Sequence, residues 1–187
     1  MARRPAVRNN RKRVFVACEG DSERGYAGFL LDIAEEIGLS LHFDLQICPG
    51  GDHLAIVQRA VAIMERRTQR HGQFWKKIIF LDSDRRGENA ERTRQADKMI
   101  VQSGLLPIWS HPCLEALILR HFPECERLNP PTANLAHQEL LRHWPDYRKR
   151  VSRSALWAKF DITHVQRAAG TNPGLLEFLK TIGFPEA

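Results

Sequence analysis

A chain of 187 residues, 43% of them hydrophobic, is long enough for one domain with a substantial core, whereas two full domains would each be small. Its longest apolar runs, such as residues 105–109, fall far short of the roughly 20 residues that span a bilayer. The basic N-terminus is not followed by the apolar stretch of a secretory signal. We therefore expect a cytoplasmic protein without a transmembrane segment.

The net charge of +6 is distributed unevenly along the chain. Residues 1–13 hold six Arg or Lys and no acid, so the remaining residues balance at 22 basic against 22 acidic. Residues 14–141 hold 14 basic and 18 acidic residues, and residues 142–167 hold seven basic and two acidic ones. An acidic centre between basic flanks favours a protein that binds a cation among carboxylates and a polyanion among Lys and Arg. A solvated basic leader and an ordinary charged helix face would give the same counts.

The four cysteines are scattered without any C-x-x-C pair, which is typical of a protein from a reducing compartment. A zinc site could be assembled from His111, Cys113, His121 and Cys125. Their spacing matches no common zinc finger, and buried free thiols are frequent in protein cores. We therefore favour a structural role for these side chains.

The first segment with a folding signal follows a basic arm. Residues 1–13 carry too little apolar surface to bury, so we expect them to be flexible. Residues 14–18 are short, continuous and apolar, as expected of a strand buried on both faces of a parallel sheet. Residues 21–22 offer a helix N-cap, and apolar residues recur at helical spacing over 26–37 until Gly38 ends the helix.

Two more strand–helix units follow. Residues 41–47 alternate like a strand, and Asp52 can cap a helix whose apolar residues run over 54–64. Residues 77–81 form another buried-strand run, and residues 89–103 have helical character. The repeated order of strand and helix predicts parallel strands joined by helical crossovers.

The fourth strand is expected at residues 105–109, with Pro112 suited to the first turn of the helix that follows. The strict alternation predicts an α/β fold with a Rossmann-like parallel sheet of about four strands flanked by helices, over residues 14–122. Strand signals vanish after residue 122, so residues 123–187 are expected to form a helical C-terminal extension packed on the same domain. Its helices are expected at residues 135–144, 163–169 and 173–182.

Acidic residues come directly after the expected strands. Glu19 follows the first, Asp52 the second, Asp82 and Asp84 the third, and Glu115 the fourth. Open parallel sheets bind ligands beyond the carboxyl ends of their strands. The two-residue spacing of Asp82 and Asp84 in extended chain points both carboxylates to one side, toward a hard cation such as Mg²⁺ or Mn²⁺.

Each acid also has a simpler interpretation. An Asp-x-Asp after a strand is common as a turn and helix cap. Asp52 could be a plain N-cap, and Glu115 a first-turn acid favoured by the helix dipole. Clustered carboxylates without a cation would repel and raise one another's pKa, however, so a purely structural role for Glu19, Asp82 and Asp84 together is disfavoured.

The motifs also resemble a known family. Residues 19–23 (Glu-Gly-Asp-Ser-Glu) and 82–84 (Asp-Ser-Asp) resemble the Glu-Gly-x-x-Glu and Asp-x-Asp motifs of Toprim domains, which occur in topoisomerases, primases, OLD-family nucleases and small ribonucleases. Topoisomerases usually carry a third acid two residues further on. Arg86 stands there in this chain, which favours the nuclease or primase-like branches.

A closer resemblance is to the RloB-like family of bacterial Toprim proteins, over roughly residues 13–122. It is carried by residues 49–52 (Pro-Gly-Gly-Asp) and by residues 110–122, which resemble a family segment written Ser-Asn-Pro-Cys-Phe-Glu-x-Trp-Leu-Leu-x-His-Phe. His111 and Leu114 replace the Asn and Phe of that segment. The Glu and His of the segment are kept as Glu115 and His121.

The resemblance implies phosphodiester chemistry in which Asp82 and Asp84 hold Mg²⁺ or Mn²⁺, while Glu19 acts as acid/base or as a further ligand. The residues proposed for a second shell or second metal are Glu23, Asp52 and Glu115. The candidate substrate contacts are Arg85, Arg150 and Lys159, the last of which resembles a family lysine.

We therefore expect a metal-dependent nuclease that hydrolyses DNA or RNA in anti-phage defence, with a partner protein as a further expectation. The alternative is a non-catalytic Toprim-like module that binds nucleic acid or a partner protein and acts with a partner subunit. A nucleotide-processing enzyme on a Rossmann-like sheet is a third hypothesis. Neither Gly20 nor the Gly50-Gly51 pair fits G-x-G-x-x-G or a P-loop, which weighs against it.

Overall fold

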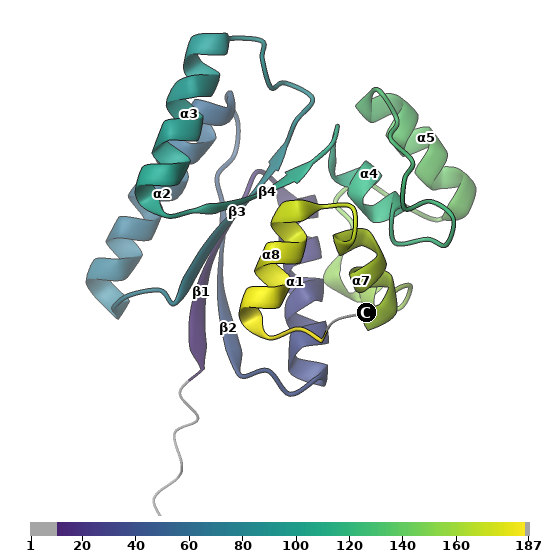
Figure 1. The fold of residues 1–187 in the computed structure, drawn as a ribbon, viewed down its shortest axis with the longest axis horizontal. Helices are drawn as coiled ribbons and strands as arrows, with labels where there is room; N and C mark the ends of the chain where they lie inside the picture. Colours follow the sequence, from purple (N-terminus) through teal and green to yellow (C-terminus); the bar gives the residue numbers. More distant parts are fainter. Residues whose placement is uncertain (1–10, 186–187) are drawn as a thin grey trace, which may run out of the picture.

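A four-stranded parallel sheet forms the centre of the molecule (Figure 1). The computed structural model describes residues 11–185. The strands are β1 (Lys12–Cys18), β2 (Leu41–Ile47), β3 (Lys76–Asp82) and β4 (Leu106–Ser110), in the spatial order β2-β1-β3-β4. All three strand pairs are parallel, which confirms the α/β fold with a parallel sheet of about four strands.

Helices cover both faces of the sheet (Figure 1). Helices α2 (His53–His71) and α3 (Ala90–Ser103) pack on one face, and helices α1 (Asp21–Glu36) and α8 (Pro173–Ile182) pack on the other. Both faces of the central strands must therefore be apolar, which explains why residues 14–18 and 77–81 read as continuous hydrophobic runs.

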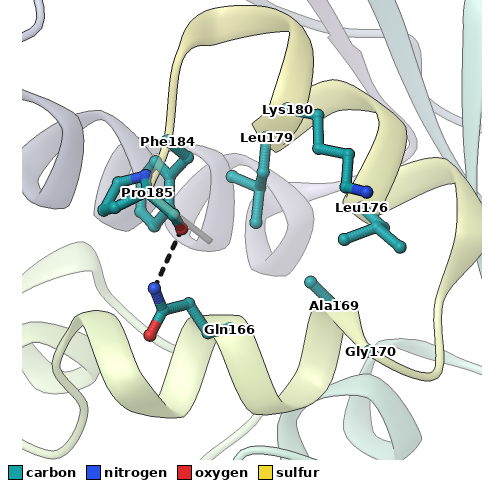
Figure 2. A pocket seen from close by; sticks show the side chains of 8 residues that line it. All are labelled: Gln166, Ala169, Gly170, Leu176, Leu179, Lys180, Phe184 and Pro185. Carbon is teal, nitrogen blue, oxygen red and sulfur yellow. Dashed lines mark hydrogen bonds between the residues drawn. The ribbon is translucent and has the colours of Figure 1, made fainter. Parts of the chain in front are cut away.

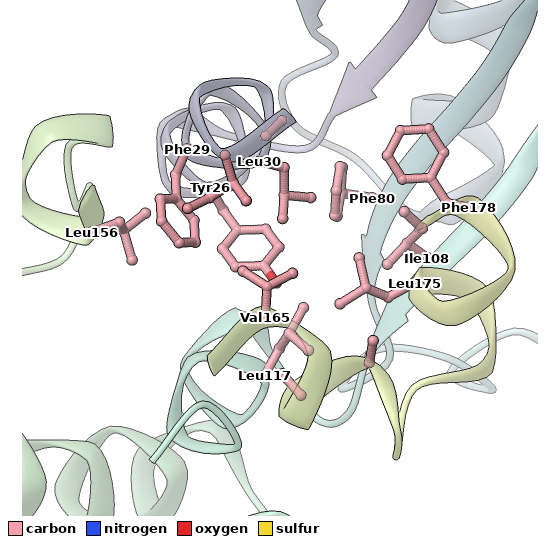
Figure 3. Packing of buried hydrophobic residues seen from close by; sticks show 14 of the residues in the cluster. Tyr26, Phe29, Leu30, Phe80, Ile108, Leu117, Leu156, Val165, Leu175 and Phe178 are labelled. Carbon is pink, nitrogen blue, oxygen red and sulfur yellow. The ribbon is translucent and has the colours of Figure 1, made fainter. Parts of the chain in front are cut away.

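Successive strand residues enter two separate cores. Val14, Val16, Ile78, Phe80 and Ile108 pack with α1 and α8, whereas Phe15, Ala17, Ile79 and Leu81 pack with α2 and α3. Figure 3 shows the first core, in which Phe80 and Ile108 of the sheet lie among Tyr26, Leu30 and Phe178 of the helices. The period of two along each strand thus divides one sheet between two hydrophobic layers.

The C-terminal extension joins the first of these cores. It follows α4 (Leu114–Leu119) and contains α5 (Ala133–His143), α6 (Arg153–Trp157), α7 (Ile162–Ala169) and α8. Leu156, Val165 and Leu175 of these helices belong to the same buried cluster as the sheet residues. None of the helices within residues 11–185 combines the length and apolar character needed to cross a membrane.

The first strand begins slightly earlier than the sequence predicts. Residues 1–10 of the expected basic arm lie outside the described residues. Strand β1 begins at Lys12, because the backbone of Lys12 pairs with the chain leading into β2, and Trp75 N donates to Arg13 O at 2.8 Å. Lys12 and Arg13 therefore belong to the sheet and not to an arm.

Two helix starts also differ from the sequence prediction. The N-cap of α1 is Gly20, not Asp21 or Ser22, because the Glu23 carboxylate reaches back and accepts from Gly20 N at 2.8 Å. Pro112 lies before α4 and not in its first turn, since Cys113 is the N-cap.

Candidate metal centre at the carboxyl edge of the sheet

Five carboxylates meet at the edge where the parallel strands end: Glu19, Glu23, Asp82, Asp84 and Glu115. We call this group the acidic cluster. Glu19 directly follows β1, Asp82 ends β3 and Asp84 lies two residues further on, while Glu23 and Glu115 stand in the first turns of α1 and α4. The pKa of Asp82 rises to about 9, first through burial and then through the negative charges of the other four. The mutual effect shows that these groups are electrostatic neighbours.

The Asp82 side chain is the least satisfied member of the cluster. Its Oδ1 is buried and has no hydrogen-bond partner among the described residues. Ser110 stands opposite Asp82 in the β3–β4 register, and its Oγ is likewise buried without a partner. The Asp82 carbonyl oxygen accepts from His53 Nε2 at 2.7 Å, which holds the backbone. A buried acceptor without a donor is unfavourable unless a proton or a cation completes the site.

Glu19 is only partly buried, at the end of β1. Burial raises its pKa, and the Asp84 charge adds to the rise, whereas a hydrogen bond from the Asp82 backbone and the charges of His53 and Arg85 oppose it. The Glu19 carboxylate thus stands at the end of β1, next to the Asp82 backbone and the Asp84 charge.

Glu23 serves both the helix and the cluster. Its side chain is 7% exposed and caps α1 through Gly20 N. Burial raises its pKa most strongly, and the charges of Glu19 and Glu115 add to the rise. The helix cap therefore brings a further carboxylate into the cluster.

Glu115 accepts a hydrogen bond from the Tyr147 hydroxyl at 3.3 Å. Tyr147 is 1% exposed and comes from the chain between α5 and α6. Burial and the Glu115 charge both raise the pKa of this phenol, so it remains a donor. Sequence reasoning missed Tyr147 and Ser110. The sequence does hold a signal for Ser110, because it lies two residues after Ile108 along β4. The two side chains therefore point to the same face of the sheet, which α1 covers.

The backbone around Asp82 and Asp84 is fixed by the neighbouring loop. Ser83 N donates to Ser110 O and to Pro112 O, each at 2.9 Å, and Asp84 N donates to Pro112 O at 3.0 Å. Ser83 Oγ lies 2.6 Å from His111 Nδ1. The loops after β3 and β4 are therefore joined by hydrogen bonds, which fix the backbone that carries Asp82 and Asp84.

Asp52 lies apart from the acidic cluster. Its carboxylate accepts from Ala55 N at 3.0 Å as the N-cap of α2 and from Arg92 Nη2 at 2.9 Å. The bond from Arg92 is the main reason why its pKa is lowered. Its charge is compensated by Arg92, and no described contact joins Asp52 to the other candidate ligands.

The three basic candidates have different surroundings. The charge of Arg85 acts on Glu19, so this side chain borders the cluster. Arg150 N donates to Ser22 Oγ at 3.0 Å, in the first turn of α1. The Lys159 ammonium lies 5.5 Å from the centroid of the Phe122 ring, and no described contact joins it to the cluster.

The residues of the zinc alternative are not grouped. His121 is fully buried in the core, where its Nε2 lies 3.2 Å from the Tyr26 hydroxyl and burial lowers its pKa to about 4. Cys125 Sγ lies 3.5 Å from His143 Nε2 instead. Within residues 11–185, no three His, Cys, Asp or Glu side chains form a group arranged to hold a metal ion, and this includes the acidic cluster.

An apolar pocket lies elsewhere, between α7 and α8 (Figure 2). Gln166 Nε2 donates to Pro185 O at 2.9 Å across it. Its walls are formed by Gln166, Ala169, Gly170, Leu176, Leu179, Lys180, Phe184 and Pro185. No acidic-cluster residue lines this pocket, so it is not part of the candidate site.

No family model, curated protein or solved structure matches this chain. The RloB-like and Toprim resemblance of the motifs therefore stays a prediction.

Proposed function

We propose that this protein is a Mg²⁺- or Mn²⁺-dependent nuclease that hydrolyses phosphodiester bonds in DNA or RNA. The observation that carries the proposal is the partly buried Asp82 carboxylate, whose Oδ1 is buried without a partner and which stands among four further acids. No Lys or Arg is hydrogen-bonded to Asp82 in the described structure. A group of carboxylates with such an excess of negative charge is chemically suited to a divalent cation.

The donor set fits a hard cation. All five members of the acidic cluster offer carboxylate oxygens, and Ser110 adds an unpartnered hydroxyl. Asp82 and Asp84 are the proposed ligands, with Glu19 as the third, and Glu23 and Glu115 as their neighbours. A bound Mg²⁺ or Mn²⁺ would supply Lewis-acid activation and stabilise the negative charge that develops on the phosphate.

The protein's own groups have separate tasks in this proposal. A water oxygen forms a bond to phosphorus while the bond from phosphorus to the leaving ester oxygen breaks. Glu19 positions the attacking water at the end of β1 and accepts its proton at the carboxylate, while the leaving ester oxygen takes a proton from solvent water. Arg85 lies beside Glu19 and can contact a phosphate oxygen of the substrate.

Anti-phage defence, with a partner protein, is the biological setting that the RloB-like motifs imply. The residues that support this setting are the Glu-Gly-x-x-Glu motif at 19–23, the Asp-x-Asp motif at 82–84 and the segment at 110–122. The polymer is left open between DNA and RNA, since the carboxylates act on the phosphodiester that both share.

The proposal is tested by comparing binding with turnover in Glu19→Gln. We expect this variant to keep nucleic-acid binding and to lose roughly 10²-fold or more of the metal-dependent cleavage rate, because a positioned acid/base is removed. The substrates should include single- and double-stranded DNA, tRNA and mixed RNA, each with Mg²⁺, Mn²⁺ and EDTA. Asp97→Asn, at an exposed ion pair with Arg86, is a control with the same charge change.

A second readout does not depend on finding the substrate. Calorimetric titration with Mn²⁺ should show binding to the native protein and none to Asp82→Asn or Asp84→Asn. Unchanged Mn²⁺ binding in both variants, or cleavage that persists in EDTA, would contradict the proposal. Tight nucleic-acid binding without metal-dependent cleavage of any polymer would favour the non-catalytic module instead.

A further inference from the structure

A segment of the C-terminal extension, residues 147–153, borders the acidic cluster and is anchored at both ends of its first turn. At one end the Tyr147 hydroxyl donates to Glu115 Oε1 at 3.3 Å. Three residues later, Arg150 N donates to Ser22 Oγ at 3.0 Å. The segment therefore bridges the first turns of α4 and α1, the two helices that carry Glu115 and Glu23.

Helix α1 is shaped to receive this segment. A Cβ atom added at Gly25 would lie 2.2 Å from the Val151 carbonyl oxygen, and one added at Gly28 would lie 3.0 Å from Arg153 Cδ. Residues three apart share one face of a helix, so these glycines form a single flat surface. The Arg153 guanidinium pairs with Asp32 further along α1. Only side chains as small as glycine allow the backbone of 151–153 to lie so close.

Three consecutive cations stand on this anchored segment: Arg148, Lys149 and Arg150, which we call the basic loop. All three are exposed. Within residues 11–185 none of them forms an ion pair, although the acidic cluster is adjacent. Arg148 Nη1 donates only to the carbonyl oxygens of Pro145 and Tyr147. The basic loop thus follows in the chain directly after Tyr147, which contacts Glu115, and its charges have no acidic partner among the described residues.

The backbone of the basic loop is fixed in an uncommon conformation. Arg150 has φ = 63°, a region that residues with a side chain rarely adopt. Anchors on both sides hold it there, through Tyr147 before it and Val151 after it. The direction in which the Arg150 side chain leaves the surface is therefore set by the fold and not by local preference.

We propose that the basic loop binds the sugar-phosphate backbone of a nucleic-acid strand next to the acidic cluster. Arg and Lys contact phosphate oxygens through charge-assisted hydrogen bonds, and the loop has cations without a protein partner. An extended polyanion passing from the loop to the cluster would meet the cations first and then the metal-binding acids. The inference rests on the proposed function for the identity of the polymer, and it concerns binding, which can be measured without cleavage.

The test uses fluorescence anisotropy with labelled single-stranded DNA and RNA in EDTA, where no cleavage is expected. The variant is Lys149→Gln with Arg150→Gln, which keeps unbranched polar side chains and removes two charges. The matched control is Arg70→Gln with Lys76→Gln, one Arg and one Lys at the opposite edge of the sheet, in the last turn of α2 and at the start of β3.

We expect the loop variant to bind about 10-fold more weakly at 0.1 M salt and to lose about 1.4 from the salt slope, since each phosphate contact on a single strand contributes about 0.7. The control should change affinity less than about 2-fold. Equal effects of the two variants would show that overall charge and not the loop governs binding. Unchanged affinity of the loop variant would equally overturn the proposal.

A variant without any charge change gives a second test. Gly25→Ala should push Val151 and the basic loop outward, and weaken binding several-fold. Gly174→Ala is its control, because a Cβ there would lie 2.3 Å from the Pro107 carbonyl oxygen, away from the loop. It should lower the melting temperature and leave affinity unchanged. Equal affinities of the two glycine variants, measured below both melting temperatures, would count against the placement of the loop.

The two proposals fail in different ways. Metal-dependent cleavage by the native protein, together with unchanged binding by the loop variant, would support the proposed nuclease activity and refute binding by the basic loop. Loss of binding by the loop variant, without cleavage of any polymer by the native protein, would support binding by the basic loop and refute the proposed nuclease activity.

Discussion

Replacing Asp82 by Asn is expected to stabilise the fold at neutral pH. The pKa of this carboxyl rises from 3.8 to about 9 on folding, mainly through burial. Between these values the folded protein holds a proton that the unfolded chain releases, so the free energy of unfolding falls as pH rises. From 3.8 to pH 7 is about three units, and at about 1.4 kcal/mol per unit the cost of keeping Asp82 protonated in the folded state is about 4 kcal/mol. Because the Asn side chain also loses hydration on folding, we expect the free energy of unfolding to rise by about 2–4 kcal/mol, or Tm by roughly 5–15 °C.

The assay is urea unfolding followed by circular dichroism, in EDTA, from pH 4 to pH 8. The stabilisation should be small near pH 4, where Asp82 is protonated in the folded protein and close to half protonated in the unfolded chain, and should grow with pH. Asp84→Asn is the matched control, since it makes the same chemical change two residues away at an exposed position. It should stay within about 0.5 kcal/mol of the native protein. Equal stabilisation by both variants, or a gain at pH 4 as large as at pH 8, would refute burial of the Asp82 charge as the cause.

Three further predictions concern other parts of the chain. Deletion of residues 1–10, which hold three arginines, should weaken nucleic-acid binding and reduce its salt slope without lowering Tm. An unchanged salt slope would show that these residues do not contact the nucleic acid. Tyr26→Phe should destabilise the fold by about 1–2 kcal/mol, because it leaves the buried His121 Nε2 without its partner, and chemical denaturation should detect the loss. Thr132→Ala should cost about 1 kcal/mol by removing the N-cap of α5, whereas Thr132→Ser should be nearly neutral; equal losses in the two would contradict a capping role.

Local signals were sufficient for the sheet and for several helices. Residues 14–18 and 77–81 are short apolar runs, and residues 41–47 alternate apolar with polar side chains, so the strand positions could be read within one or two residues. The sequence prediction for α8, residues 173–182, is confirmed, because Asn172 caps the helix, Pro173 starts it and Gly183 ends it. Helix α6, with five residues, was missed because it is too short to show helical periodicity.

The candidate site was only partly predictable, since its geometry depends on contacts between distant residues. The rule that acids gather at strand ends placed Glu19 and Asp82 correctly at one edge. The same rule does not distinguish Asp52 from the residues of the acidic cluster. Asp52 is hydrogen-bonded to Arg92, 40 positions away in the sequence, which compensates its charge. Nor could any spacing predict the contact of Tyr147 with Glu115, which is made by the return of the extension to the sheet.

The position of α8 has a consequence for synthesis of the protein. This last helix covers the sheet face that also carries α1, with Phe178 against Phe43 at 5.9 Å between ring centroids. A chain released before residue 173 would leave Phe43, Phe80 and Ile108 without that cover, and such apolar surface promotes aggregation or proteolysis. A chain interrupted before α8 would therefore be prone to removal before it reaches the native fold.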